Sequence, residues 1–286
     1  MREPPAGVAE AVVLDVVRGS WQPRADAIAH LPVGFGAHHW AVSVDGTPTL
    51  FVTLDALGKR HDLRSLRSTY GATSALARAG LDFVHASLEP WAVPLGGGAL
   101  SSTPWLEGVR PSSLDLAATA EALHRLHTTP PPSGLRQWRP LVGPGLADDL
   151  ADRVRPAWRT GPFGELARAA IADRLSAVTG WVAAYHALAA EARARTWVPT
   201  HGEPGLHNQL VTPTGLRLVD WESLMLAPAE RDLLTLGTGD PAMLEMFDLE
   251  WRLVEVSQYA TWFEATHTGT ADDEVALQGL LDELGA

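Results

Sequence analysis

The sequence contains no cysteine, and no uninterrupted apolar run approaches the roughly 18–20 residues that a membrane-spanning helix requires. The first absence excludes disulfides, thiol catalysis and thiolate metal sites. The second excludes a membrane span. Near the amino terminus, Pro4, Pro5, Glu10 and Asp15 stand where a secretory signal would have a basic start and an apolar stretch. We therefore expect a cytoplasmic protein.

Lysine is almost absent as well, because Lys59 is the only one and the other basic residues are arginines. The 34 acidic residues outnumber 22 basic residues, which gives a formal net charge of −12. This balance argues against a nucleic-acid partner, which would require a basic surface. It favours the approach of a cationic small molecule, although acidity alone is common among soluble proteins.

The first hundred residues have the pattern of a small β-sheet. Trp40–Val44 and Thr49–Leu54 flank Asp45-Gly46, a dipeptide suited to a tight hairpin turn. A glycine-bearing loop precedes this hairpin. Further along, the sequence predicts a helix over residues 60–79 that ends at Gly80, and strands at residues 81–84 and 92–95.

Beyond residues 101–108, where a strand runs into proline and glycine, the pattern becomes helical. A chain of 286 residues is long enough for two lobes. We expect a β-rich lobe at residues 1–103 and an α-rich lobe at 104–286, which is an α+β protein. The predicted helices are 113–127, 146–154, 165–190 with a break near Gly180, 242–267 and 272–284.

The segment Thr200–Leu236 carries the pattern most indicative of chemistry. Glu203 and Asn208 lie five residues apart on a loop broken by glycine and proline, and the short apolar run Leu216–Val219 leads into Asp220. Phosphoryl transfer uses one acid near the attacking hydroxyl and oxygen ligands for Mg2+ beside the phosphates. The segment therefore predicts a phosphotransferase site.

These residues resemble a known family. The order His201-Gly202-Glu203, Asn208, Asp220-Trp221 and Arg231-Asp232 is similar to the core of the aminoglycoside phosphotransferase family, within the protein-kinase-like fold. The strings at residues 32–40 and 51–55 resemble its spectinomycin phosphotransferase-like branch. The resemblance implies a small antiparallel sheet with one helix, followed by a larger, mostly helical lobe.

The resemblance also implies roles for the residues of the loop. Glu203 stands where the family has its catalytic aspartate, and it would orient the acceptor hydroxyl and act as the base. Asn208 and Asp220 would bind Mg2+. His201 would brace the loop, and Asp232 would accept hydrogen bonds from backbone N–H groups behind it. Glutamate in place of aspartate is a departure from the family pattern.

For the nucleotide, the resemblance implies that Gly34 and Gly36 close over the phosphates and that the hinge residues Ser102, Thr103 and Trp105 contact the base. A second departure concerns the third strand, where Thr53 stands near the lysine that such enzymes use to hold phosphates. The helix that follows contains no acid to pair with a lysine. Lys59 or an arginine of the same segment could supply the missing contact with the phosphates.

The acceptor is expected to contact Glu222, His207 and Trp221. The adjacent His38 and His39 could contact phosphates or acceptor, but the simpler expectation is that one packs under the strand and the other is solvated. Most acidic residues of the last two helices are expected on a solvated face. The predicted reaction moves the γ-phosphate of ATP or GTP, with Mg2+, to a hydroxyl of a cationic antibiotic. The candidate acceptors are spectinomycin, other aminoglycosides and basic cyclic peptides of the capreomycin or viomycin type.

Two alternatives stay open at this point. One is a kinase of a small metabolite such as choline, homoserine or a sugar. The other is a kinase-like protein that binds nucleotide or ligand without catalysis, which the missing lysine favours. The presence of both Asn208 and Asp220 argues against it, because a scaffold has no need of two metal ligands. We expect a monomer or a homodimer.

Overall fold

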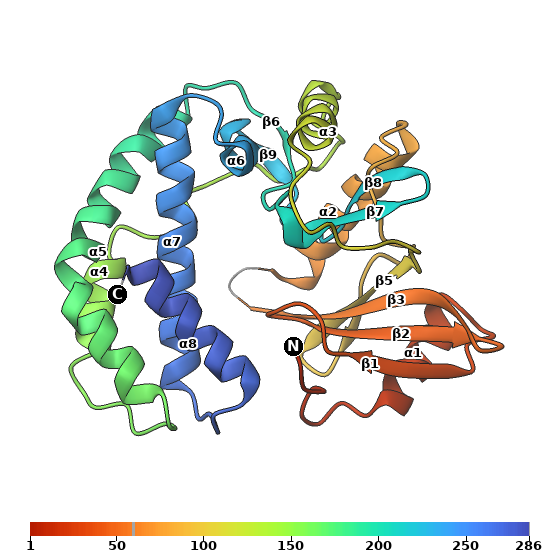
Figure 1. Cartoon of the computed structure of the whole chain (residues 1–286), viewed down its shortest axis with the longest axis horizontal. Helices are drawn as coiled ribbons and strands as arrows, with labels where there is room; N and C mark the ends of the chain where they lie inside the picture. Colours follow the sequence, from red (N-terminus) through yellow and green to blue (C-terminus); the bar gives the residue numbers. More distant parts are fainter. Residues whose placement is uncertain (59–60, 286) are drawn as a thin grey trace. The chain divides into compact units, whose positions relative to one another are not determined.

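A computed structural model of the chain describes residues 1–58 and 61–285 and divides into two compact units. Unit 1 comprises Met1–Gln137 and Trp197–Leu236, and unit 2 comprises Trp138–Thr196 and Gly237–Ala286. Each unit is therefore made of two segments that are distant in the sequence, as the colours of Figure 1 show. The secondary structure confirms the α+β class.

Unit 1 contains a five-stranded antiparallel sheet with the order β1-β2-β3-β5-β4 (Figure 1). Its strands are β1 (Ala27–Leu31), β2 (His38–Val44), β3 (Thr47–Ala56), β4 (Val93–Leu95) and β5 (Gly98–Pro104). Asp45 and Gly46 have φ of 50° and 76°, so the predicted hairpin between β2 and β3 is confirmed. Alternate residues of β3, from Leu50 to Leu54, enter a core with Val13 and Val17 of helix α1 (Glu10–Ser20). The sequence analysis missed this helix.

Helix α2 (Leu63–Arg78) follows the sheet. Asp62 caps it by accepting a hydrogen bond from the Ser65 N–H at 2.6 Å, so the helix begins at residue 63. Gly80, with φ of 94°, ends it as predicted. The strand predicted at residues 81–84 is wrong: this segment is a turn, and Val84 forms a single parallel bridge with Leu218. Its apolar residues are buried in a core cluster rather than paired along a strand.

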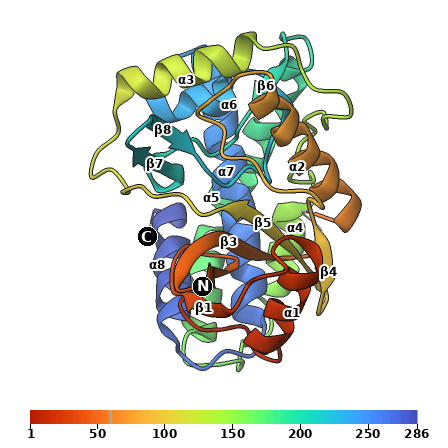
Figure 2. The same cartoon turned by 90° about the vertical axis from the view of Figure 1, so that its right-hand side faces the viewer.

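The remainder of unit 1 consists of one helix and short elements that frame a loop. They are α3 (Leu116–Thr128), β6 (Val198–Thr200), η1 (Leu206–Asn208), β7 (Gln209–Thr212), β8 (Gly215–Leu218), β9 (Met225–Ala227), α6 (Glu230–Leu233) and η2 (Leu234–Leu236). Strand β6 pairs with β9, and β7 pairs with β8. Figure 2 shows α3 and the β7–β8 hairpin together on one side of the five-stranded sheet.

Unit 2 consists of α4 (Leu146–Arg153), α5 (Gly164–Ala192), α7 (Pro241–Glu264) and α8 (Ala271–Leu284). The predicted break at Gly180 is wrong. Helix α5 continues through Gly180, because a single glycine costs an otherwise helical segment only about 1 kcal/mol. Not all the acidic residues are solvated: Glu250 is buried and accepts hydrogen bonds from the Trp138 indole at 2.9 Å and the Tyr185 hydroxyl. Asp272 and Asp273 are buried too.

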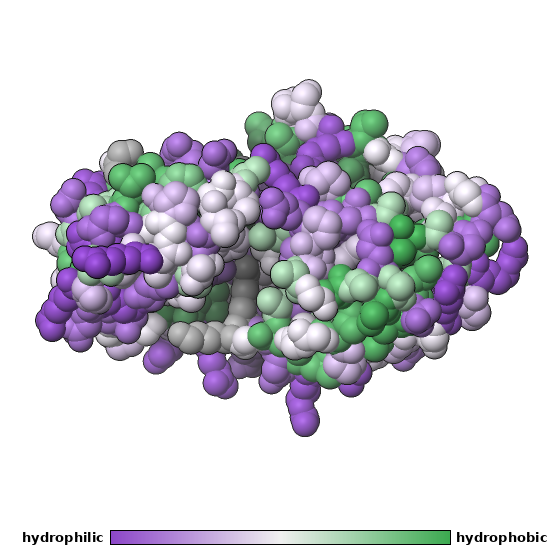
Figure 3. All heavy atoms as spheres, turned by 90° about the horizontal axis from the view of Figure 1, so that it is seen from below, coloured by the Kyte–Doolittle hydropathy of each residue, from purple (hydrophilic) through white to green (hydrophobic). Residues whose placement is uncertain are grey.

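Among the helices of residues 1–58 and 61–285, none is both long and apolar enough to cross a membrane. On the face that Figure 3 draws, hydrophobic residues gather on the lower right-hand part, and hydrophilic residues surround them and cover much of the rest. The large exposed apolar residues come from many different elements, for example Val12, Phe35, Leu166 and Trp251. Such scattered residues are usual on a globular protein.

Candidate active site

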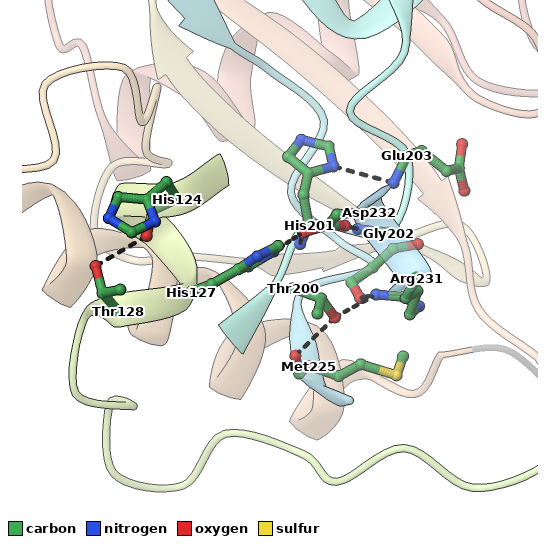
Figure 4. A network of polar contacts seen from close by, with 11 residues as sticks. His124, His127, Thr128, Thr200, His201, Gly202, Glu203, Met225, Arg231 and Asp232 are labelled. Carbon is green, nitrogen blue, oxygen red and sulfur yellow. Dashed lines mark hydrogen bonds and ion pairs between the residues drawn. The ribbon is translucent and has the colours of Figure 1, made fainter. Parts of the chain in front are cut away.

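The loop that carries Glu203 connects β6 to β7 and begins with a tightly constrained turn. Gly202 has a φ of +100°, and a Cβ at this position would collide with the guanidinium of Arg231. That guanidinium donates to the Thr200 hydroxyl at 3.0 Å and to the Ser223 carbonyl at 3.1 Å (Figure 4). Both the backbone conformation and the close approach therefore require glycine at position 202.

Asp232, on α6, holds the start of the loop from behind. Its buried carboxylate accepts hydrogen bonds from the N–H groups of His201 at 3.0 Å and Gly202 at 2.6 Å, and lies 2.9 Å from His127 Nε2 (Figure 4). Burial opposes ionisation, but the hydrogen bond and charge of His127, together with the charges of His201 and Arg231, hold the pKa of Asp232 below its ordinary value. The carboxylate is thus ionised and fully engaged.

His201 links the loop to the strand that precedes Asp220. The buried ring places Nε2 2.9 Å from the Val219 carbonyl, and Nδ1 accepts the Glu203 N–H at 3.2 Å. A neutral ring with its proton on Nε2 satisfies both contacts. Burial lowers the pKa of the ring below its ordinary value, against the raising effect of Asp232. His201 is therefore a brace, with both nitrogens occupied by the protein.

Glu203 is held by its backbone on both sides. Its N–H donates to His201, and its carbonyl accepts the Asn208 side-chain N–H at 3.0 Å. In Figure 4 its carboxylate projects away from the network around His201 and Asp232. The exposed His207 brings Nε2 to 3.9 Å from this carboxylate, which is an ion-pair distance when the ring is protonated. These two hydrogen bonds thus fix the backbone position of Glu203, from which its carboxylate extends.

Asn208 and Asp220 are brought together by the backbone. The Asn208 carbonyl accepts the Val219 N–H at 3.0 Å, so the next residue, Asp220, lies beside this strand-like contact. Because the Asn208 side-chain nitrogen donates to Glu203, its amide oxygen is the end that can serve as a ligand. Asp220 has a φ of 67°, a left-handed conformation that aspartate tolerates better than most residues.

This donor set fits Mg2+. An amide oxygen and a carboxylate are hard ligands, and Mg2+ is commonly held by one or two carboxylates with waters and substrate phosphates. Within residues 1–58 and 61–285, no three histidine or acidic side chains are grouped as a metal site. A closed site for zinc would need four such protein ligands. The arrangement therefore suits Mg2+ whose remaining ligands are water and the phosphates of a nucleotide.

Of the three expected acceptor contacts, Trp221 is corrected by the structure. Its side chain is 2% exposed and lies in a core cluster, with its indole N–H donating to the Leu218 carbonyl at 2.7 Å. The ring packs 4.4 Å from the ring of His201. Trp221 thus supports the brace and offers no surface to an acceptor. Glu222 is half-buried, and His207 is exposed.

The glycine loop lies between β1 and β2, and Gly34 and Gly36 have φ of 72° and 87°. Both positions therefore require the freedom of glycine. Thr53 lies on β3 directly opposite His39 of β2, and its hydroxyl oxygen is 3.1 Å from His39 Nδ1. Lys59 lies outside the residues that the structure describes.

The hinge residues Ser102, Thr103 and Trp105 were expected to offer backbone groups to the base, and the fold already uses the N–H of Trp105. This N–H donates to the Thr49 carbonyl at 2.8 Å. The Ser102 carbonyl accepts the Leu88 N–H at 2.7 Å, and its side chain is buried. Thr103 is half-buried and opposite Phe51 on β3. Much of the hinge backbone is thus used by the fold itself.

Sequence reasoning missed the contact between β3 and α2. The Tyr70 hydroxyl of α2 donates to the Asp55 carboxylate of β3 at 3.0 Å. Burial, and then the charges of Asp55, Glu222 and Asp220, raise the pKa of Tyr70 well above its ordinary value, so the phenol stays a donor. The acid is thus on the strand and its hydrogen-bond donor on the helix, the reverse of a strand lysine paired with a helix acid. The spacing of Asp55, two residues after Thr53 on one strand face, was the available signal.

Comparisons with known proteins agree with this geometry. The sequence profile of the phosphotransferase enzyme family matches residues 28–269. Over 88 residues, the chain is 42% identical to protein StrN of Streptomyces griseus; the match covers 28% of this chain and only 27% of StrN.

Two solved structures resemble the whole fold. Spectinomycin phosphotransferase APH(9)-Ia, in complex with ADP and spectinomycin, has a TM-score of 0.72 at 13% identity, over 96% of this chain and 94% of that chain. Choline kinase LicA from Streptococcus pneumoniae has a TM-score of 0.56 at 10% identity, over 96% and 97% of the two chains. At these identities the likeness is one of fold.

Proposed function

Because the chain belongs to the phosphotransferase enzyme family, we propose that it transfers the γ-phosphate of ATP to a hydroxyl of a small cationic antibiotic and so confers resistance. The observation that carries this proposal is the meeting of Glu203, Asn208 and Asp220 around one buried brace, His201. We assign the nucleotide to residues 1–103 and the acceptor to residues 104–286.

In this mechanism, Glu203 accepts a hydrogen bond from the acceptor hydroxyl and orients its oxygen toward the phosphate. The proton passes to the Glu203 carboxylate as the new P–O bond forms and the bond to the leaving diphosphate breaks. The brace at His201 holds the Glu203 backbone, so the carboxylate reaches the hydroxyl without searching many loop conformations.

Asn208 and Asp220 would hold Mg2+ through the amide oxygen and the carboxylate. When bound, this ion neutralises charge between the phosphates. Asp220 follows β8 with a left-handed backbone, and the hydrogen bond from the Val219 N–H to the Asn208 carbonyl brings the two ligands near each other. Gly34 and Gly36 would let the loop between β1 and β2 cover the phosphates.

The nature of the acceptor is inferred from charge and from the family. A protein of formal net charge −12 favours cationic ligands, and the structurally similar APH(9)-Ia was solved with spectinomycin. We therefore place spectinomycin first, followed by other aminoglycosides and the basic cyclic peptides capreomycin and viomycin.

The test is a coupled ADP-release assay with Mg-ATP and each candidate acceptor, and mass spectrometry of the product. One antibiotic should gain the mass of a phosphoryl group, and the Glu203→Gln variant should lose that product while still binding nucleotide. GTP is compared with ATP at the same concentration. Absence of product with every antibiotic would refute the antibiotic assignment.

A second candidate acceptor is a small metabolite hydroxyl such as that of choline, which the fold likeness to choline kinase LicA favours. Choline, homoserine and simple sugars therefore belong in the same assay. Product from one of these and from no antibiotic would favour a metabolic kinase. Nucleotide binding with no product from either group would favour a non-catalytic scaffold.

A further inference from the structure

His39 occupies a defined position between the glycine loop and the sheet. It stands opposite Thr53 in the β2–β3 register, with Nδ1 3.1 Å from the Thr53 hydroxyl oxygen. The ring also stacks on Phe51, with centroids 5.0 Å apart and planes at 29°. Two contacts from one strand thus fix both the orientation and the tilt of the imidazole.

The opposite edge of the ring faces the loop. A Cβ at Gly34 would lie 2.9 Å from His39 Nε2, so this nitrogen lies close to the backbone of the glycine loop, and a side chain at position 34 would crowd it. Gly34 also has a φ of +72°, which by itself favours glycine. When the Thr53 hydroxyl donates to Nδ1, the ring proton is on Nε2, and Nε2 becomes a donor directed at the underside of the loop.

The electrostatic surroundings connect this ring to the metal ligands. The charge of Asp220 acts on His39, while burial lowers the pKa of His39 to about 4. The ring is therefore neutral near pH 7 and adds no buried positive charge to the sheet. A neutral N–H can still donate a hydrogen bond to a phosphate oxygen.

We propose that His39, oriented by Thr53, donates a hydrogen bond from Nε2 to a phosphate oxygen of the bound nucleotide, at the place where related kinases use a lysine. The inference rests on the proposed nucleotide-dependent function and deepens it. It also gives Thr53 a role of its own, since a hydroxyl that donates to Nδ1 leaves the ring proton on Nε2. Thr53 is a positioning residue in this scheme, and His39 is the one that touches the ligand.

Isothermal titration calorimetry of Mg-ATP and of adenosine tests this inference. His39→Ala should weaken Mg-ATP binding by about tenfold or more, the scale of one hydrogen bond to a charged group, and leave adenosine binding within about twofold. Thr53→Val should weaken Mg-ATP binding by a smaller factor. His38→Ala is the matched control, because the neighbouring ring bonds the Glu3 carbonyl at 3.0 Å instead.

A spectroscopic reading separates contact from packing. In 15N-histidine NMR, the resonance that disappears in His39→Gln should report an Nε2-protonated ring and should shift on addition of Mg-ATP but not of adenosine. Unchanged Mg-ATP affinity in His39→Ala, or equal losses of ATP and adenosine, would overturn the inference and leave the proposed function intact. Failure of the unmodified protein to bind any nucleotide would instead refute the proposed function.

Discussion

The two halves of the candidate site in unit 1 are built in opposite ways. The loop around Glu203 is fixed by charged and buried groups, with Asp232, His201 and Arg231 each engaged by several contacts. The sheet face beneath the glycine loop contains no cation among the contacts described: His39 lies against Thr53, and the Tyr70 hydroxyl donates to the Asp55 carboxylate. The catalytic half thus concentrates charge, while the nucleotide half avoids a buried cation.

The difference has a physical reason. A buried charge is stable only with a partner, and a lysine on β3 would need an acid on α2, which has none. Losing both groups together leaves no buried charge unpaired. The consequence is that phosphate binding should depend more on the metal ligands than it does in kinases with a lysine.

The largest expected effect is on Asp220. Asp220→Asn keeps a residue that tolerates the left-handed backbone but removes the charge that would hold Mg2+. We expect transfer to fall on the order of a thousandfold or more, measured as ADP release, with an unchanged melting temperature. Asp45→Asn is the matched control, since Asp45 also has positive φ and belongs to a surface hairpin. Near-normal turnover in Asp220→Asn would contradict the idea that the loop half of the site depends on charge to bind Mg2+.

Glu203→Ala should have the next largest effect on turnover. Removing the base costs about a hundredfold or more in kcat and leaves KM for nucleotide nearly unchanged, because Glu203 acts on the acceptor. Glu203→Asp shortens the side chain to the acid usual in the family and measures whether reach matters. A rise in the nucleotide KM with unchanged kcat would mean that Glu203 is not the base and acts on nucleotide binding instead.

Asp232→Asn tests the charged brace by stability. We expect a loss of about 3 kcal/mol at pH 7, the scale of breaking a buried ionic network, measured by denaturant unfolding. The folded-state pKa of Asp232 lies below its ordinary value of 3.8, so its contribution is present above that pH and disappears as pH falls through the folded value. The difference in unfolding free energy between the unmodified protein and Asp232→Asn should therefore become smaller as the pH falls toward 3.

Asp82→Asn provides the control for this experiment. Asp82 pairs with Arg125 at 2.9 Å, but its side chain is 68% exposed. Such a pair contributes little, so we expect a change below about 1 kcal/mol. Equal destabilisation by the two substitutions would mean that the buried brace is no stronger than a surface ion pair.

Sequence and structure agree best where local chemistry decides. Asp45-Gly46 set the hairpin and Gly80 ended the helix, because both need positive φ whatever surrounds them. Thr200–Leu236 supplied Glu203, Asn208 and Asp220 in an order that indicates one reaction. Neither inference required knowledge of distant contacts.

The errors arose where contacts between distant residues decide. The partner of Asp232 is His127, which lies 105 residues away and has no local signature as a brace. Trp221 follows Asp220 and was expected in the site, yet its side chain is buried in the core. Tyr70 and Asp55 were passed over because a lysine and an acid were sought there. Tertiary packing, which a single sequence does not display, settled all three.

The smallest effect predicted within the candidate site concerns the sheet face beneath the glycine loop. Tyr70→Phe removes the hydroxyl that joins α2 to β3 and should cost about 1 kcal/mol of unfolding free energy, because Asp55 loses one hydrogen bond. The double variant with Asp55→Asn should cost less than the sum of the single changes if the two side chains act on each other. Strict additivity would show that they do not. A loss as large as that of Asp232→Asn would mean that this single hydrogen bond contributes as much to stability as the network around Asp232, and the contrast between the two halves would fail.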